Sequence, residues 1–73
     1  MSEKLPAITP KKLIKILVNL GFILYRQTGS HQIFVKDNQQ VIVPYHNRDL
    51  KKGTLIQIIK GTGLSIGEFK KLI

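Results

Sequence analysis

The sequence predicts an α+β fold in which two helices pack on one face of a three-stranded antiparallel sheet and a short helix follows at the C-terminus. Apolar residues recur at helical spacing in residues 10–20 and again in residues 54–60. Between these segments, three runs rich in β-branched and aromatic residues are separated by two short turns. Turns of this length join antiparallel neighbours, so the predicted order is α-β-β-β-α plus one final helix.

The first helix is predicted over residues 10–20. Thr9 is a favoured N-cap residue, and Pro10 is favoured at the first helical position. Gly21 follows as the expected C-terminal stop. The apolar stripe that should face the core consists of Leu13, Ile16, Leu17 and Leu20.

Three strands are predicted at residues 22–27, 31–36 and 40–44, with turns at residues 28–30 and 37–38. Successive side chains of a strand point to opposite faces of the sheet. In the middle strand both faces carry apolar residues. The sequence therefore leaves open which face meets the helices, and whether the first residue of that strand is exposed.

The second helix is predicted over residues 54–60, with Gly61 and Gly63 expected to end it. Ser65 and Glu68 fit the capping-box pattern and predict a short third helix. Both main helices are expected on one face of the sheet, with the other face open. This arrangement is the architecture of double-stranded RNA-binding domains.

The length of 73 residues is sufficient for a single domain with one small core. A chain of this size buries only about 60% of its unfolded surface, so we expect any chemistry on an open face. Residues 1–73 are predicted to form one domain, with residues 1–8 as a flexible tail. The chain has no cysteine, no signal-peptide pattern and no apolar run near the ~20 residues of a membrane helix, which is typical of a cytoplasmic protein.

Charge is the strongest compositional signal. Twelve Lys and Arg residues stand against four Asp and Glu residues, which gives a net charge of +8 and a pI near 10.1. Such a domain attracts a polyanion, which can be a nucleic acid, an anionic membrane surface or an acidic protein. Of these partners we expect nucleic acid, and we expect neither a membrane nor a small-molecule ligand.

The carboxylates are few, and they are scattered along the chain at Glu3, Asp37, Asp49 and Glu68. Two-metal nucleases need several carboxylates that converge on the metal ions, so we expect no metal site. The sequence has no glycine-rich phosphate loop, and no cofactor is expected.

Two histidines, His31 and His46, remain as candidates for proton transfer, because imidazole can take or give a proton near neutral pH. RNA supplies its own nucleophile, the 2′-hydroxyl, so one well-placed base can start cleavage without a metal ion. His31 is the candidate catalytic residue, and His46 is a candidate for a second proton transfer or a phosphate contact. The alternatives are that His31 is an ordinary surface residue and that His46 is a loop residue bonded to the backbone.

Basic residues near the predicted helix starts are candidates for phosphate binding. Lys51 and Lys52 precede the second predicted helix, whose N-terminus favours anions. The alternative is that these side chains are merely solvated. Tyr25 and Tyr45 can stack on bases, although strand packing is the expected role of Tyr25. The candidate phosphate-binding residues are Lys11, Lys12, Lys15, Arg48, Lys51 and Lys52.

Four segments, GSHQIF, VIVPYH, GTLIQIIK and LSIGEF, resemble the HicA family of toxin–antitoxin mRNA interferases, and the resemblance extends from the first helix to Phe69. It implies a double-stranded-RNA-binding-domain-like fold and a ribonuclease that cleaves mRNA and blocks translation. It also implies that His31, in the G-S-H motif, is catalytic and that a HicB-type antitoxin masks it. Asn47 departs from the family, which commonly has glycine after the second histidine; Asn tolerates a left-handed backbone better than most residues.

The leading hypothesis is a metal-independent endoribonuclease toxin in which basic residues hold phosphates and His31 acts as general base or acid. The first alternative is an RNA-binding module of the same fold without catalysis. The second is an interaction protein whose basic face serves only an acidic partner.

Overall fold

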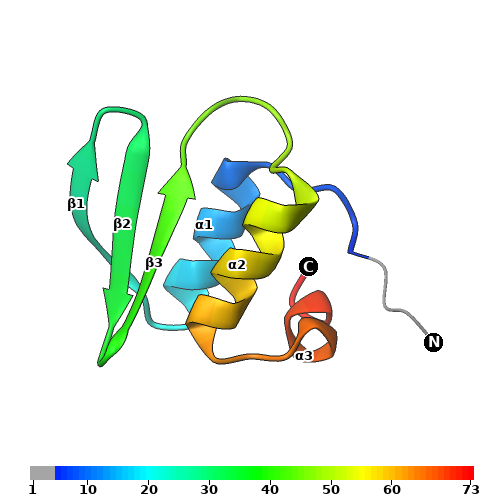
Figure 1. The fold of residues 1–73 in the computed structure, drawn as a ribbon. Helices are drawn as coiled ribbons and strands as arrows, with labels where there is room; N and C mark the ends of the chain where they lie inside the picture. Colours follow the sequence, from blue (N-terminus) through cyan, green and yellow to red (C-terminus); the bar gives the residue numbers. More distant parts are fainter. Residues whose placement is uncertain (1–4) are drawn as a thin grey trace.

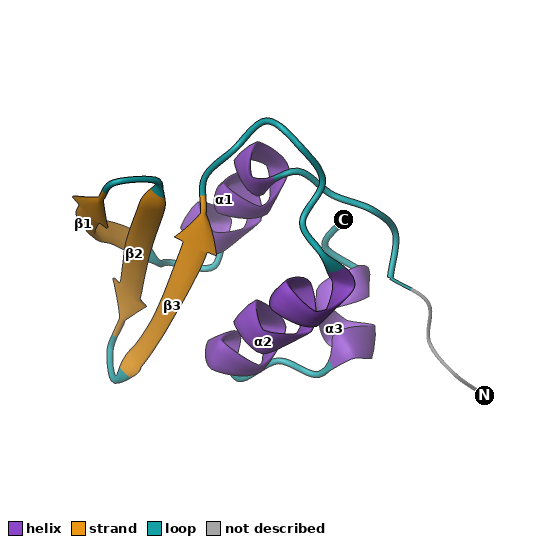
Figure 2. Ribbon diagram, turned by 45° about the horizontal axis from the view of Figure 1, so that its top comes forward, coloured by secondary structure: helices purple, strands orange, loops and turns teal. Residues whose placement is uncertain are grey.

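The computed structural model describes residues 5–73. The helices and strands follow the order α1 (Pro10–Asn19), β1 (Ile23–Thr28), β2 (His31–Lys36), β3 (Gln39–Pro44), α2 (Lys52–Thr62) and α3 (Ile66–Lys70). The strands form one antiparallel sheet in the order β1-β2-β3 (Figure 1). Both α1 and α2 lie on the same side of this sheet, and α3 lies beside α2 (Figure 2). The fold is therefore the α+β, double-stranded-RNA-binding-domain-like layout that the sequence predicts.

The predicted starts of α1 and α3, and the predicted stop after α1, are confirmed by the backbone and capping contacts. The hydroxyl of Thr9 accepts a hydrogen bond from the backbone N–H of Lys12 (3.3 Å), and Gly21 has the positive φ of 102° expected after a helix. At α3, the Glu68 carboxylate accepts from the Ser65 N–H (2.9 Å) while the Ser65 hydroxyl accepts from the Glu68 N–H (3.1 Å).

Hydrogen bonds to the Glu68 carboxylate, first from the backbone of Ser65 and second from its side chain, hold the pKa of Glu68 below its ordinary value of 4.5. A carboxyl group whose pKa is lower in the folded than in the unfolded protein stabilises the fold at pH values above its unfolded pKa. That contribution is lost as the pH falls through the lower folded value. Protonation of Glu68 in acid therefore weakens the start of α3.

The second helix is longer than the predicted range of residues 54–60, since it begins at Lys52 and ends at Thr62. Gly61 lies inside it and does not break it. A Cβ atom at Gly61 would lie 2.6 Å from Cγ1 of Val41 in β3, so glycine here lets the helix approach the sheet closely. Gly63, with φ at 81°, is the residue that ends the helix.

Replacing Gly61 with alanine is expected to lower the free energy of unfolding by about 1–3 kcal/mol, because the new methyl group overpacks the contact with Val41. Gly53→Ala in the same helix is the matched control, since a Cβ atom there meets nothing within 4 Å. This control should keep or raise the stability by up to about 1 kcal/mol through helix propensity. Urea unfolding of both variants makes the comparison, and equal stabilisation by both would exclude the packing role of Gly61.

The core lies between the sheet and the two long helices. Phe34 of β2 is only 2% exposed and faces the helices, as do Val41 and Val43 of β3. Ile8, which we expected in a flexible tail, is also 2% exposed, so the core already includes the segment before α1; residues 1–4 lie outside the described part. The other principal core side chains are Leu13, Leu17, Phe22, Leu55, Ile58, Ile59 and Phe69.

Candidate nucleic-acid interface and catalytic residue

The orientation of Phe34 settles which face of the sheet is open. Because side chains alternate along a strand, His31 points to the face opposite Phe34, away from the helices. His31 is exposed, and its strand neighbours are Thr28 on β1 and Pro44 on β3. The open face, as we call it below, consists of Ile23, Arg26, Thr28, His31, Ile33, Val35, Gln40, Ile42 and Pro44.

The loop of residues 45–51 is fixed at both of its ends. At its start, the backbone N–H of Tyr45 donates to the carbonyl oxygen of Ser30 (2.6 Å), directly before His31. At its end, the N–H of buried Leu50 donates to the carbonyl oxygen of Ile8 (2.9 Å), just before α1 begins. The loop therefore connects the neighbourhood of His31 with the start of α1 (Figure 1).

His46 lies in this loop, and its ring bonds the local backbone. Its Nδ1 atom accepts a hydrogen bond from the N–H of Arg48 (3.2 Å), which is the backbone-bonding role weighed above as the alternative. While this bond persists, Nδ1 carries no proton, so the neutral ring has its N–H at Nε2 and can donate from there. In this conformation His46 is suited to donating a hydrogen bond to a phosphate.

Asn47 does not use the left-handed backbone that glycine at this position would favour. Among residues 5–73, Asp37 is the one non-glycine residue with positive φ, at 52° in the turn between β2 and β3. The loop therefore follows its path without the special conformational freedom of glycine at Asn47.

Five of the six predicted phosphate-binding side chains gather around the start of α1 and the loop. Lys11, Lys12 and Lys15 line one shallow hollow along α1, and Lys11 also lines a second hollow of about 310 Å³ shared with Tyr45 and His46. A third hollow lies beside His46, where the loop contributes three further charged side chains. These are Arg48, Asp49 and Lys51. We call Lys11, Lys12, Lys15, Arg48 and Lys51 the cationic cluster.

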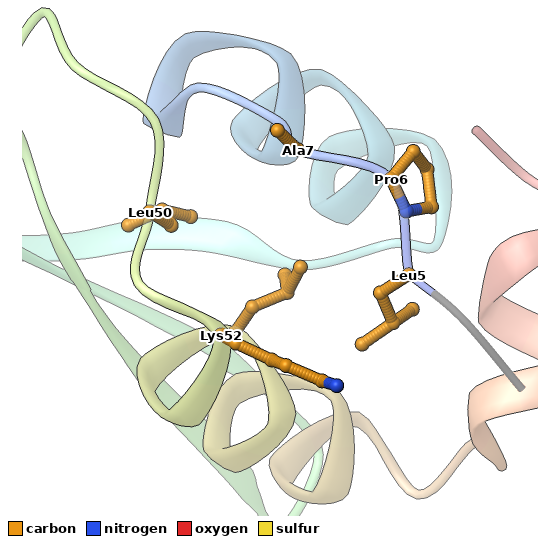
Figure 3. Close-up of a pocket in the computed structure, with 6 residues that line it drawn as sticks. Leu5, Pro6, Ala7, Leu50 and Lys52 are labelled. Atoms are coloured by element: carbon orange, nitrogen blue, oxygen red, sulfur yellow. The ribbon is translucent and has the colours of Figure 1, made fainter. Parts of the chain in front are cut away.

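Lys52 is not part of the cationic cluster, although it adjoins Lys51 in the sequence. Lys51 is the N-cap of α2, and Lys52 is the first residue of the helix. Lys52 lines a separate hollow of about 320 Å³ beneath the chain segment that leads into α1, opposite Leu5 and Pro6 (Figure 3). Lys51 and Lys52 therefore line different hollows, and binding of phosphate by both remains a prediction.

Arg26 is a basic residue near the candidate site that the sequence analysis did not single out. It pairs with Ile33 on β2, and Thr28 pairs with His31, so Arg26 lies one step from His31 on the open face. Two residues apart on one strand share a face, and diagonal partners on neighbouring strands lie about 7–8 Å apart at their Cα atoms. Arg26 is exposed, so its guanidinium is accessible beside the candidate catalytic histidine.

The open face also carries an apolar surface. Ile23 is 65% exposed and Ile42 is 47% exposed. Tyr25 is 70% exposed, so its expected packing role is not observed; every residue of β1 is exposed, and the helices leave this strand uncovered. Exposed apolar side chains clustered in this way are typical of a surface that binds another protein.

The residues that could hold a metal ion do not converge. Within residues 5–73, no three His, Asp or Glu side chains gather closely enough to coordinate one. One carboxylate, that of Asp49, lines a hollow together with Arg48 and Lys51 of the cationic cluster. The basic side chains are suited to binding phosphates directly.

Comparison with known proteins identifies the family. Residues 10–64 match the family model for the HicA toxin of bacterial toxin–antitoxin systems. The chain belongs to the HicA toxin family. The match covers α1, the sheet, the loop and α2, and therefore all of the HicA residues discussed above as site candidates. No curated protein gave a match. None of the helices in residues 5–73 of this HicA toxin is both long and apolar enough to cross a membrane.

Proposed function

We propose that this HicA-family toxin is a metal-independent endoribonuclease that cleaves mRNA and so inhibits translation in the cytoplasm. The observation that carries the proposal is the exposed imidazole of His31 on the open face. The carbonyl oxygen of the preceding residue, Ser30, accepts a hydrogen bond from Tyr45 in the loop that carries Arg48 and Lys51 of the cationic cluster. A group that can exchange protons is thus exposed on a face bordered by a loop whose basic side chains, Arg48 and Lys51, can hold phosphates.

The reaction that suits this arrangement is an internal transfer within the RNA. The 2′-oxygen attacks the adjacent phosphorus as a base takes its proton, and the bond from phosphorus to the 5′-oxygen breaks as an acid supplies a proton. The products are a 2′,3′-cyclic phosphate and a 5′-hydroxyl. We assign His31 one of these two proton transfers, while the cationic cluster holds the flanking phosphates. His46 is our candidate for the second proton transfer or for a phosphate contact.

Membership of a toxin–antitoxin family implies an antitoxin partner. We propose that this antitoxin is of the HicB type and covers the open face, where Ile23 and Ile42 are exposed on the same side of the sheet as His31. The net charge of +8 favours an acidic partner. If this placement holds, Ile42→Lys should weaken inhibition by the antitoxin; full inhibition of that variant would contradict it.

The second candidate function is an RNA-binding module without catalysis, and the structural hydrogen bond of His46 to Arg48 favours it. In that case His31 contacts RNA but transfers no proton. Incubation of the purified toxin with mRNA in excess EDTA separates the two functions. The endoribonuclease cleaves under these conditions, whereas the binding module retards the RNA on a gel and leaves it intact. If the toxin neither binds nor cleaves the RNA, the remaining hypothesis is an interaction protein whose basic face serves an acidic partner.

A further inference from the structure

The β-bulge in β1 has a consequence for the chemistry of the open face. Ile23 and Leu24 pair with Val35 and Phe34, but the register shifts before Arg26, which pairs with Ile33. Tyr25 is the extra residue of this bulge. In the unshifted register Arg26 would pair with Gln32, whose side chain shares the face of Phe34. The bulge therefore turns Arg26 from the helix side of the sheet to the open face.

We propose that Arg26 is a further catalytic residue, which binds the phosphate that is cleaved and stabilises its negative charge in the transition state. This inference rests on the proposed ribonuclease function. Bulges are over-represented beside active sites, where they redirect a side chain, and this bulge directs the one arginine of the sheet toward the face of His31.

The charges around Arg26 support this role. Its neighbours on the open face are Thr28, His31 and Ile33, none of which is acidic, so its guanidinium is not neutralised by a carboxylate of that set. A guanidinium presents paired N–H donors that match two oxygens of one phosphate. As charge accumulates on those oxygens during attack, the hydrogen bonds strengthen, and the rate increases as a result.

Arg26 also differs in position from the cationic cluster. Those residues line hollows at the start of α1 and in the loop, so they are placed for flanking phosphates, while Arg26 adjoins His31 within the sheet. Loss of a flanking contact weakens binding of substrate and transition state alike, whereas loss of Arg26 should act mainly on the transition state. The two roles are distinguishable as an effect on KM and an effect on kcat.

The kinetic test compares Arg26→Ala, Arg26→Lys and Arg48→Ala, with circular dichroism to check folding. Arg26→Ala should lower kcat by about 10²- to 10³-fold with KM changed less than about threefold, and millimolar guanidinium ion should restore part of the rate. Arg26→Lys should retain intermediate activity. Arg48→Ala, which removes the same charge from the loop, should mainly raise KM. A kcat of Arg26→Ala equal to that of the unaltered toxin would overturn the proposal.

A binding measurement tests Arg26 without requiring cleavage. A 2′-deoxy oligonucleotide has phosphates but no 2′-hydroxyl, and its addition should shift the NMR signals of the His31 ring in the unaltered toxin. The shift should be lost in Arg26→Ala and kept in Arg48→Ala. If RNA is not cleaved but this pattern is seen, the ribonuclease function fails while the phosphate site of Arg26 stands. If RNA is cleaved and the His31 shift persists in Arg26→Ala, only the role of Arg26 fails.

Discussion

His31→Ala is expected to lower the rate of RNA cleavage by about 10²- to 10⁴-fold, the usual effect of removing a general acid or base. The physical reason is the position of the imidazole on the open face, where it contributes a proton-transfer group but little packing. The variant should therefore fold normally and still bind RNA. Single-turnover cleavage of a defined mRNA, together with growth after expression of the toxin alone, measures the effect.

His46→Ala is the matched control for this variant, because it removes the other histidine of the chain. Its ring bonds the backbone of Arg48, so its loss should disturb the loop and reduce cleavage by a smaller factor than the loss of His31. If His31→Ala still cleaves RNA and still arrests growth, His31 is not catalytic. If His46→Ala loses more cleavage activity than His31→Ala, the principal proton transfer would have to be assigned to His46 in the loop.

Replacing Lys11, Lys12 and Lys15 together by glutamine is expected to weaken RNA binding by about a hundredfold at 0.1 M salt. Each phosphate contact on a single strand contributes about 0.7 to the slope of log K against log salt concentration. Three lost contacts lower that slope by about 2, which corresponds to this loss of affinity. Titration of a fluorescent oligonucleotide at several salt concentrations gives both the affinity and the slope.

The matched control removes the same charge from the opposite end of the molecule. Lys60, Lys70 and Lys71 are exposed near the end of α2 and in and just after α3, away from the loop (Figure 1). Their replacement by glutamine should leave the slope nearly unchanged. Equal losses of affinity in the two triple variants would show that RNA responds only to net charge, and the cationic cluster would then have no special role.

The sequence was sufficient to predict the order of the helices and strands, because local signals specify that order. The start and end of α1 are specified by Thr9, Pro10 and Gly21, whose capping preferences depend on neighbouring residues alone. The Ser65 capping box specifies the start of α3 in the same way. The error at Gly61 has a tertiary cause. Glycine inside a helix usually signals an end, but here it is required by the close approach of Val41 in another element.

The candidate site was only partly predictable, because its parts come together through contacts between distant segments. His31 and the lysines of α1 are recognisable as residue types, yet the path of the loop between their segments depends on hydrogen bonds to Ser30 and Ile8, which are distant in the sequence. The sequence pattern does not predict that Arg26 shares a face with His31, because a regular register would pair Arg26 with Gln32 on the helix side of the sheet. The bulge at Tyr25 shifts the pairing by one residue and so changes the face on which Arg26 lies. A regular alternation of apolar and polar residues along the strand does not predict such a bulge.

Analysis of the ends left on cleaved RNA tests the central claim most directly, namely that His31 promotes attack by the neighbouring 2′-oxygen without a metal ion. Cleavage in excess EDTA should leave a 2′,3′-cyclic phosphate and a 5′-hydroxyl, and a single 2′-deoxy nucleotide at the cleaved position should prevent the reaction. Products with a 3′-hydroxyl and a 5′-phosphate would contradict the claim, because those ends arise when water attacks the phosphorus instead.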